Sequence, residues 1–354
     1  MTHPSPLRLL TLGGLAAAGA WAVSSAARRS AYSFRGRSVV ITGGSRGLGL
    51  ELAREFASEG ARLALLARDA DELRRACAEL ANTGATVFAL PCDVCNRPQV
   101  RDAIDRAAAR FGGIDVLVNN AGLMQVAPLQ HMREEDFDAA MAVNFFGPLV
   151  ATLAAIPHLR RAGGGRIVNV ASIGGKIAVP HMLPYTASKF GLVGLSDGLR
   201  AELRREGIFV TTVCPGPMRT GSPGHALFKG RHRREYAWFA IMDSLPLLSV
   251  ESRRAARRIV HACRMGRARL LLGAPTKLAT LMNELFPGAT ACLAATANRL
   301  LPEPDTAAGD RAHLGRSSES SWTRSFLTRA SRRAAVRNNQ NVGASSPRST
   351  RPRN

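Results

Sequence analysis

Short apolar runs and longer segments with helical spacing alternate along the chain from about residue 36 to residue 275. The runs at Ser38–Thr42, Arg62–Ala67 and Val116–Asn119 are rich in Val, Ile and Leu, which is typical of parallel strands buried on both faces. Residues 50–58, after the first run, carry apolar side chains at helical spacing. This pattern predicts a domain of the α/β class.

Two further segments follow the α/β part. Apolar side chains in residues 276–302 recur at helical spacing, which predicts one or two helices broken at Pro287-Gly288. These helices could cap the core, line a substrate cavity or touch a membrane, and the sequence leaves the alternatives open. From residue 303 the chain is rich in Ser, Arg, Asn, Pro and Gly, which predicts a disordered basic tail over residues 303–354.

The N-terminal segment, residues 1–35, is apolar and is flanked by arginines. Residues 9–27 carry no charge and are just long enough to span a bilayer. A cleaved signal peptide, a membrane anchor and a helix packed on the protein are all compatible with this stretch. Several arginines follow it directly and would resist translocation, which favours an anchor with the rest of the protein on the cytoplasmic side. A soluble cytoplasmic protein is the alternative.

Charge and cysteine content narrow the function classes. The 354 residues include 48 Lys and Arg against 26 Asp and Glu, a net charge of +22. No basic run is interleaved with aromatic residues as a stacking groove requires, so we expect no nucleic-acid partner. Anionic lipid head groups, or an arginine-rich composition without a partner, explain the charge better. The six cysteines, including the lone pair Cys92 and Cys95, suggest neither a disulfide framework nor a metal site.

A glycine-rich turn follows the first predicted strand and opens the first predicted helix. Glycines let a backbone approach a pyrophosphate, and a helix N-terminus offers free N–H groups to it. Strand, glycine turn and helix together predict a dinucleotide site. Its residues are Gly43, Ser45, Arg46, Gly47, Leu48 and Gly49.

The second predicted strand indicates which dinucleotide binds. An acid at the end of this strand would hold the ribose hydroxyls of NAD, but Ala67 stands there and Arg68 follows. Arg46 and Arg68 instead suit the 2′-phosphate of NADP. Asp69 and Glu72 are interpreted as the N-cap and capping box of the next helix.

A second group of residues suits proton transfer. Tyr185 and Lys189 are four residues apart, so a helix places them on one face. An ordinary tyrosine has a pKa near ~10, and a neighbouring cation lowers it toward neutrality. A predicted strand from Gly165 ends in Ser172, thirteen residues before Tyr185, and Ser172 would hydrogen-bond a substrate oxygen.

These motifs, in this order, resemble the classical short-chain dehydrogenase/reductase family, in its membrane-anchored type. The shared patterns are the spacing of Thr42, Gly43, Gly47 and Gly49, the Asn-Asn-Ala-Gly run from Asn119, the Ser172, Tyr185 and Lys189 set, and the loop from Pro215 to Thr220. The resemblance implies a Rossmann fold with a doubly wound, seven-stranded parallel sheet over residues 36–275. It also implies a homo-oligomer.

The resemblance also assigns roles to individual residues. Tyr185 is the catalytic acid/base, Lys189 binds the nicotinamide ribose, and Asn144 holds a water in a proton relay. Asp93 contacts the adenine, and Asn119 supports the sheet where the backbone of Ala121 and Gly122 passes the cofactor. The loop with Pro215 and Gly216 closes over the nicotinamide, where Thr220 would bond the carboxamide.

The expected function is NADP(H)-dependent interconversion of a ketone or aldehyde and an alcohol. The lid, residues 221–249, is rich in aromatic and aliphatic side chains, which favours a hydrophobic, lipid- or steroid-like substrate. Its basic cluster, residues 229–234, could meet an anionic substrate or a membrane. His181 could face the substrate or lie on the surface. The alternatives are a non-catalytic nucleotide-binding or interaction module, and an epimerase or dehydratase on the same scaffold.

Overall fold

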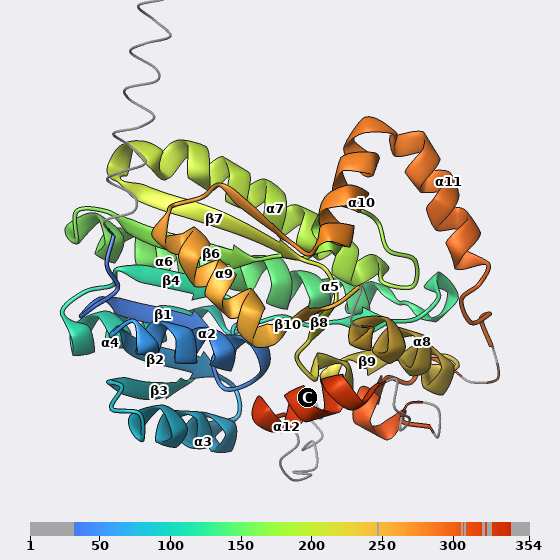
Figure 1. Ribbon diagram of the computed structural model, residues 1–354, viewed down its shortest axis with the longest axis horizontal. Helices are drawn as coiled ribbons and strands as arrows, with labels where there is room; N and C mark the ends of the chain where they lie inside the picture. The colour runs from blue at the N-terminus through green and yellow to red at the C-terminus, as the bar shows by residue number, and fades with distance from the viewer. Residues whose placement is uncertain are drawn as a thin grey trace, which may run out of the picture.

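A parallel sheet forms the centre of the computed structural model, which describes residues 32–245, 248–305, 307, 309–320, 323 and 328–340 (Figure 1). Its seven strands lie in the order β11-β7-β6-β4-β1-β2-β3. The prediction of a doubly wound, seven-stranded parallel sheet is confirmed. The strands are β1 (Ser38–Thr42), β2 (Arg62–Ala67), β3 (Val87–Pro91), β4 (Val116–Asn119), β6 (Gly165–Val170), β7 (Ile208–Pro215) and β11 (Arg269–Leu272).

The strand order reverses between β1 and β4. From β1 the chain runs outward through β2 to β3, and from β4 it runs the other way through β6 and β7 to β11. The last residues of the two central strands, Thr42 and Asn119, pair in register. Their loops therefore diverge from the same point, which is where open α/β sheets bind ligands.

Helices cover both faces of the sheet, and each face has its own apolar cluster. One cluster joins the sheet to α2 (Gly47–Ser58), α3 (Ala70–Ala81) and α9 (Ser252–Arg264). The other joins it to α4 (Arg97–Phe111) and α6 (Gly147–Arg161). In Figure 1, α9 crosses in front of β6 and β7. The inner strands β1, β4 and β6 are fully buried because both faces are covered.

The helix α7 (Leu183–Leu203) packs against β7 and carries the predicted catalytic tyrosine and lysine. Beside it, α5 (Glu134–Met141), a π-helical turn at Ala142–Phe146 and α6 form one continuous stretch. Among the described residues, this stretch, Glu134–Arg161, is the one long and apolar enough to cross a membrane by length and composition. Half of its most apolar window is buried inside the protein, as in a core helix.

The predicted helices after the α/β part are present. They are α10 (Ala274–Leu285) and α11 (Pro287–Asn298), so the predicted break at Pro287 is confirmed. Both stand away from the sheet at the upper right of Figure 1. Their large apolar side chains are exposed: Leu278, Leu281, Met282, Leu285, Phe286 and Leu293.

The prediction of a disordered tail is wrong for the described part of residues 303–340. Strand β12 (His313–Leu314) pairs with β9 (Leu227–Phe228), which pairs in turn with β5 (Gln125–Val126). Helix α12 (Arg329–Arg337) then packs on α8 (His232–Ser244) and the short strand β8 (Met218–Arg219), and its residues Ser331, Ala334 and Ala335 are buried. The polar composition of these residues did not predict the strand and helix, because both are stabilised by contacts with residues far away in the sequence. Residues 1–31 and 341–354, including the predicted anchor, lie outside the described residues.

Candidate active site

The glycine turn between β1 and α2 is a cradle that side chains would fill. Gly43 and Gly47 have φ values of +63° and +58°, which favour glycine. A Cβ on Gly43 would lie 2.9 Å from the Cα of Ala121, and one on Gly49 would clash with the Gly43 carbonyl oxygen. Side chains at positions 43 and 49 would therefore collide with the protein itself, so this tight turn requires glycine at both positions.

The N-terminus of α2 has no side-chain cap; the N–H of Gly47, its first residue, donates to the backbone carbonyl of Asn338 (3.0 Å). Its N-cap, Arg46, makes no capping hydrogen bond, and its first turn contains no acidic residue. Ser45 and Leu48 are buried beside it. A helix start without a side-chain cap or a first-turn acid, together with the positive end of the helix dipole, favours an anion at this place.

Asn120 fixes the turn, and the sequence analysis assigned it no role. Its Nδ2 donates to the carbonyl oxygens of Thr42 (3.1 Å) and Gly43 (3.0 Å). The neighbouring Asn119 points elsewhere: its Nδ2 donates to Thr152 and Asn169 inside the protein. Asn119 thus supports the sheet as expected but does not face the cofactor edge. The signal in the sequence was the pair of adjacent asparagines at the end of a buried strand, where each side chain holds a different part of the backbone or core in place.

Charged residues gather where the adenosine would lie. Arg46 pairs with Glu72 (Nη1–Oε1, 2.9 Å) and contacts the ring of His225 (2.9 Å). Burial, with the positive charge of Arg46, lowers the pKa of His225 to about 4. Arg68 is exposed at the end of β2. Asp93 accepts a hydrogen bond from the backbone of Cys95.

The prediction of a capping box at the start of α3 holds for the N-cap Asp69 but not for Glu72. Asp69 is the N-cap, and its carboxylate accepts from the backbone N–H groups of Asp71 and Glu72. The side chain of Glu72 does not return to the cap. It accepts hydrogen bonds from Ser45 and Arg46 instead, because a charged partner is nearer to it than the helix start.

The four predicted catalytic residues come together at the ends of β4 and β6. Ser172 lies two residues after the end of β6 and hydrogen-bonds Tyr185. The Nζ of Lys189 lies 5.7 Å from the centre of the Tyr185 ring and donates to the carbonyl of Val170 (2.9 Å). A Cβ on Gly122 would lie 3.3 Å from the Asn144 Oδ1 and 3.8 Å from the Lys189 Nζ, so Gly122 brings these two side chains within reach of one small space.

Asn144 is held rigidly in the π-helical turn. Its Oδ1 accepts from the backbone N–H of Leu123, and its Nδ2 donates to the carbonyl of Leu123, both at 2.9 Å. The same Nδ2 donates to Ser188 (3.0 Å), on the catalytic helix. A π-turn often marks a functional place in a helix, and this one points Asn144 at the catalytic group.

Burial dominates the ionisation of the catalytic pair. It raises the pKa of Tyr185 to about 12, although the hydrogen bond from Ser172 opposes the shift. Burial also lowers the pKa of Lys189 to about 8. We expected a lowered tyrosine pKa; the shift runs the other way, because the loss of solvent outweighs the hydrogen bond from Ser172.

The loop after β7 borders the site on the nicotinamide side. Gly216 donates its N–H to Leu272 at 3.3 Å, and a Cβ there would clash with Thr276 of α10. Thr220 is buried, and its hydroxyl bonds Ser222 (2.9 Å). Pro215 closes β7. The loop is thus fixed between the sheet and α10.

The lid helix α8 (His232–Ser244) packs aromatic residues against Tyr185. Phe228, Tyr236, Trp238 and Phe239 join Met182 and Tyr185 in one apolar cluster. Two expectations about polar lid residues change. Lys229 is buried and pairs with Asp136, and His181 is buried and pairs with Glu235 (2.9 Å), so neither lies on the surface.

The lid also holds a carboxyl group that the sequence analysis missed. Asp243 is buried and accepts from the N–H of Met218 (2.9 Å), while its Oδ2 has no partner among the described residues. Burial raises the pKa of Asp243 to about 7. Its charge acts on Tyr185 and raises the pKa of the phenol.

A cavity of about 220 Å³ lies between the lid and the C-terminal residues. The loop 221–225 and α8 form one side, including His225, Tyr236 and Ser244. The other side is lined by Arg316, Glu319, Thr323 and residues of the segment 328–340, most of them polar. The C-terminal segment thus forms one wall of a cavity beside the lid, and Ser172, Tyr185 and Lys189 are not among the residues that line it.

Known proteins show the same combination of fold and motifs. The sequence profile of a family described as short chain dehydrogenase matches residues 37–226. The chain is 35% identical over 201 residues to D-threitol dehydrogenase of Mycolicibacterium smegmatis, which covers 56% of this chain and 77% of that protein. It is 33% identical over 257 residues to the putative oxidoreductase SadH of Mycobacterium tuberculosis, with coverages of 72% and 92%.

A solved structure with a similar fold is L-sorbose reductase of Gluconobacter frateurii, complexed with NADPH and L-sorbose. The two structures align with a TM-score of 0.61 and 24% identity over 68% of this chain and 96% of the other. At this identity the likeness supports the fold.

Proposed function

The chain belongs to the short chain dehydrogenase family, and from this premise we propose that it is an NADP(H)-dependent oxidoreductase that interconverts a ketone or aldehyde and an alcohol. The observation that carries the proposal is the convergence of Ser172, Tyr185, Lys189 and Asn144 beside the glycine cradle. These side chains come from three parts of the chain, the π-helical turn, the segment after β6 and α7, and a structural role alone does not require them to meet.

The side chains of the site divide the work of carbonyl reduction. A bound nicotinamide cofactor supplies the hydride. The hydroxyl of Tyr185 donates a proton to the carbonyl oxygen, and Ser172 donates a hydrogen bond to the same oxygen as charge develops on it. In the reverse direction the Tyr185 oxygen accepts the proton of the alcohol.

Lys189 and Asn144 support the proton transfer. Positive charge on Lys189 stabilises a phenolate on Tyr185 after the proton has left. Asn144 fixes the backbone of Leu123 beside Lys189, which keeps the space around the ammonium group polar. The Tyr185 phenolate can then regain a proton through the polar groups around Lys189 and Asn144.

The preference for NADP(H) is supported by charge at the adenosine end. Arg46 and Arg68 border the place of the ribose, and no acid ends β2. Glu72 opposes the preference, because it holds Arg46 in an ion pair. A 2′-phosphate must take Arg46 from Glu72, and the two negative charges of the phosphate favour that exchange.

The apolar cluster around Tyr185 supports a hydrophobic substrate, of the lipid or steroid type. Aromatic lid side chains exclude water from the Tyr185 hydroxyl and offer few hydrogen-bond partners to a substrate with many hydroxyl groups. A panel of aldehydes and ketones, from long-chain aliphatic to sugar-like, tests this with NADPH consumption as the signal. A preference for the sugar-like compounds would refute the substrate class.

The Tyr185→Phe variant tests the enzymatic function itself. It keeps the ring in the apolar cluster and removes only the proton donor. We expect turnover to fall by about two to four orders of magnitude, the usual contribution of a positioned acid. NADPH binding should stay within about twofold of the unmodified protein, and full activity in the variant would contradict the proposal.

Membrane attachment through the N-terminal segment forms the last part of the proposal. It is supported by the uncharged stretch at residues 9–27 and the arginines after it. The catalytic part would then face the cytoplasm. Fractionation of cells that express the full chain or a chain without residues 1–30 tests this; equal release of both into the soluble fraction would refute it.

A further inference from the structure

The C-terminal segment, residues 328–340, lies on the glycine cradle. The backbone N–H of Gly47 donates to the carbonyl of Asn338 (3.0 Å). The side-chain amide of Asn339 donates to the carbonyls of Ser45 (2.9 Å) and Glu72 (3.0 Å). The Nε2 of Gln340 lies 2.6 Å from the place of a Cβ on Gly47.

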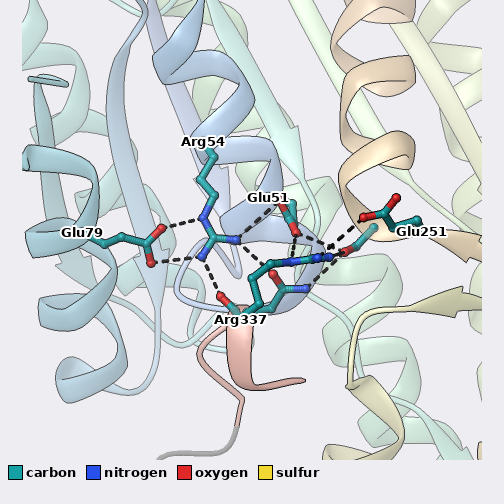
Figure 2. A network of polar contacts seen from close by, with 7 residues as sticks. Glu51, Arg54, Glu79, Glu251 and Arg337 are labelled. Atoms are coloured by element: carbon teal, nitrogen blue, oxygen red, sulfur yellow. Dashed lines mark hydrogen bonds and ion pairs between the residues drawn. The ribbon is translucent and has the colours of Figure 1, made fainter. Parts of the chain in front are cut away.

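Polar contacts with α2 hold this segment in place (Figure 2). The guanidinium of Arg337 bonds Glu51 (3.2 Å) and Ser252 (3.1 Å), and it lies 3.6 Å from Glu251. Arg54 donates to the carbonyl of Arg337 (2.7 Å) and to the side chain of Asn338 (3.0 Å). These bonds join the end of the chain to the helix that begins at the cradle.

The buried carboxylate of Glu51 favours docking of the segment, because Arg337 pairs with it. Its carboxylate is 3% exposed, and a buried charge is costly without partners. Arg54 contributes one contact at 3.5 Å and Ser252 another at 3.2 Å, while Arg337 supplies the second positive charge. The C-terminal segment thus completes the pairing of a buried acid on α2.

The segment also reaches the nicotinamide side of the site. Ala335 packs so closely on Gly221 that a Cβ there would clash with it. Gly221 follows Thr220 in the loop that borders the catalytic group. The ring of His225 bonds the carbonyl of Gln340 (3.0 Å). The C-terminal segment therefore covers the site from the loop after β7 to the glycine cradle.

A dinucleotide and this segment need the same groups. The N–H of Gly47 stands at the uncapped start of α2, where a pyrophosphate would take it. One N–H cannot fully serve the carbonyl of Asn338 and a phosphate oxygen together. Gln340 also fills space that glycine leaves open at position 47.

We propose that the C-terminal segment is autoinhibitory: it competes with the dinucleotide for the glycine cradle and must leave before the cofactor binds. The inference rests on the proposed function, since it takes the cradle to be the cofactor site. A covalently attached segment needs only weak contacts to compete, because its effective concentration is high. Its contacts are mainly polar and charged, so they can be released without exposing an apolar core.

Nucleotide titration of full-length variants tests the competition. Arg337→Ala with Asn339→Ala removes the bonds to Glu51, Ser252, Ser45 and Glu72. Arg333→Ala, on an exposed arginine of the same helix, is the control for charge. We expect the double variant to bind NADPH about tenfold tighter, as for a segment that occupies the cradle about nine-tenths of the time. The control should bind as the unmodified protein does.

Limited proteolysis of the unmodified protein gives a second readout that needs no variant. We expect saturating NADPH to speed tryptic cleavage at the arginines of residues 329–337, because the segment must leave. Slower cleavage with NADPH, or weaker binding by the double variant, would show that the segment clamps the cofactor and would overturn the proposal. Equal affinities would overturn it too. Binding of neither NADPH nor NADH to any variant would instead remove the dinucleotide site itself.

Discussion

Tyr185 and Lys189 lie where charge on either side chain is disfavoured. Burial raises the pKa of the tyrosine to about 12 and lowers that of the lysine to about 8. In the protein without cofactor, the ammonium group bonds the carbonyl of Val170. At neutral pH the pair is therefore a neutral phenol beside a cation, which suits proton donation to a carbonyl.

The pH dependence of reduction should follow Lys189. A lysine is charged below its pKa and loses the charge as pH rises through it. We expect kcat/KM for carbonyl reduction to be level below pH 8 and to fall above it, because kcat/KM reports the free enzyme. Steady-state rates with NADPH at a series of pH values measure this.

Asp243 provides the control for this profile, because its pKa of about 7 lies close by. Asp243→Asn removes that titration and leaves Lys189 in place. The fall above pH 8 should remain in the variant. If the fall disappears with the carboxylate, Asp243 controls the rate and the assignment to Lys189 is wrong.

Glu72 should weaken the preference for NADPH. Its ion pair with Arg46 is partly exposed, with side-chain exposures of 12% and 33%, so its release is worth about 1 kcal/mol or less. Glu72→Gln should bind NADPH up to about fivefold tighter and leave NADH affinity unchanged. Asp71→Asn, on the same helix turn, is the matched control. Equal gains for both nucleotides would mean that Arg46 does not contact a 2′-phosphate.

At the scale of elements, local patterns were predictable from sequence and distant contacts were not. The cradle at Gly43, Gly47 and Gly49 is encoded within one strand, turn and helix, and Tyr185 and Lys189 within one helix turn. Helix α12 was missed because its buried face consists of small residues such as Ala334 and Ala335. These carry no strong apolar signal, and they pack on residues more than a hundred positions earlier.

The Asn120 contacts tie two elements together at the cradle. Asn120→Ala removes two hydrogen bonds, to the carbonyls of Thr42 and Gly43, and should destabilise the fold by about 1–3 kcal/mol. Thermal unfolding measures the loss, and nucleotide titration should show weaker binding. Asn82→Ala, at the exposed end of α3, is the control. An unchanged melting temperature would show that the turn is fixed by its glycines alone.

At the scale of the whole molecule, the last described residues, 328–340, lie beside the glycine turn. The sheet brings the ends of β1, β4 and β6 to one edge, and the residues after β11 return to that edge through α10, α11 and α12. The sequence predicted the sheet and its catalytic edge, because strands and motifs follow one another in order. It could not show that a polar tail would cover the edge, because that depends on charges such as Glu51 that become buried only in the fold.

A fluorescence titration of the full chain with NADPH and with NADH tests directly whether the protein binds a nicotinamide dinucleotide and prefers NADP(H). It needs no knowledge of the substrate. We expect the protein to bind both nucleotides and to bind NADPH at least about tenfold more tightly than NADH, a difference in binding free energy of about 1.4 kcal/mol. Equal or tighter binding of NADH would contradict the assignment of Arg46 and Arg68, and binding of neither, even in the Arg337→Ala and Asn339→Ala double variant, would contradict the dinucleotide-dependent oxidoreductase itself.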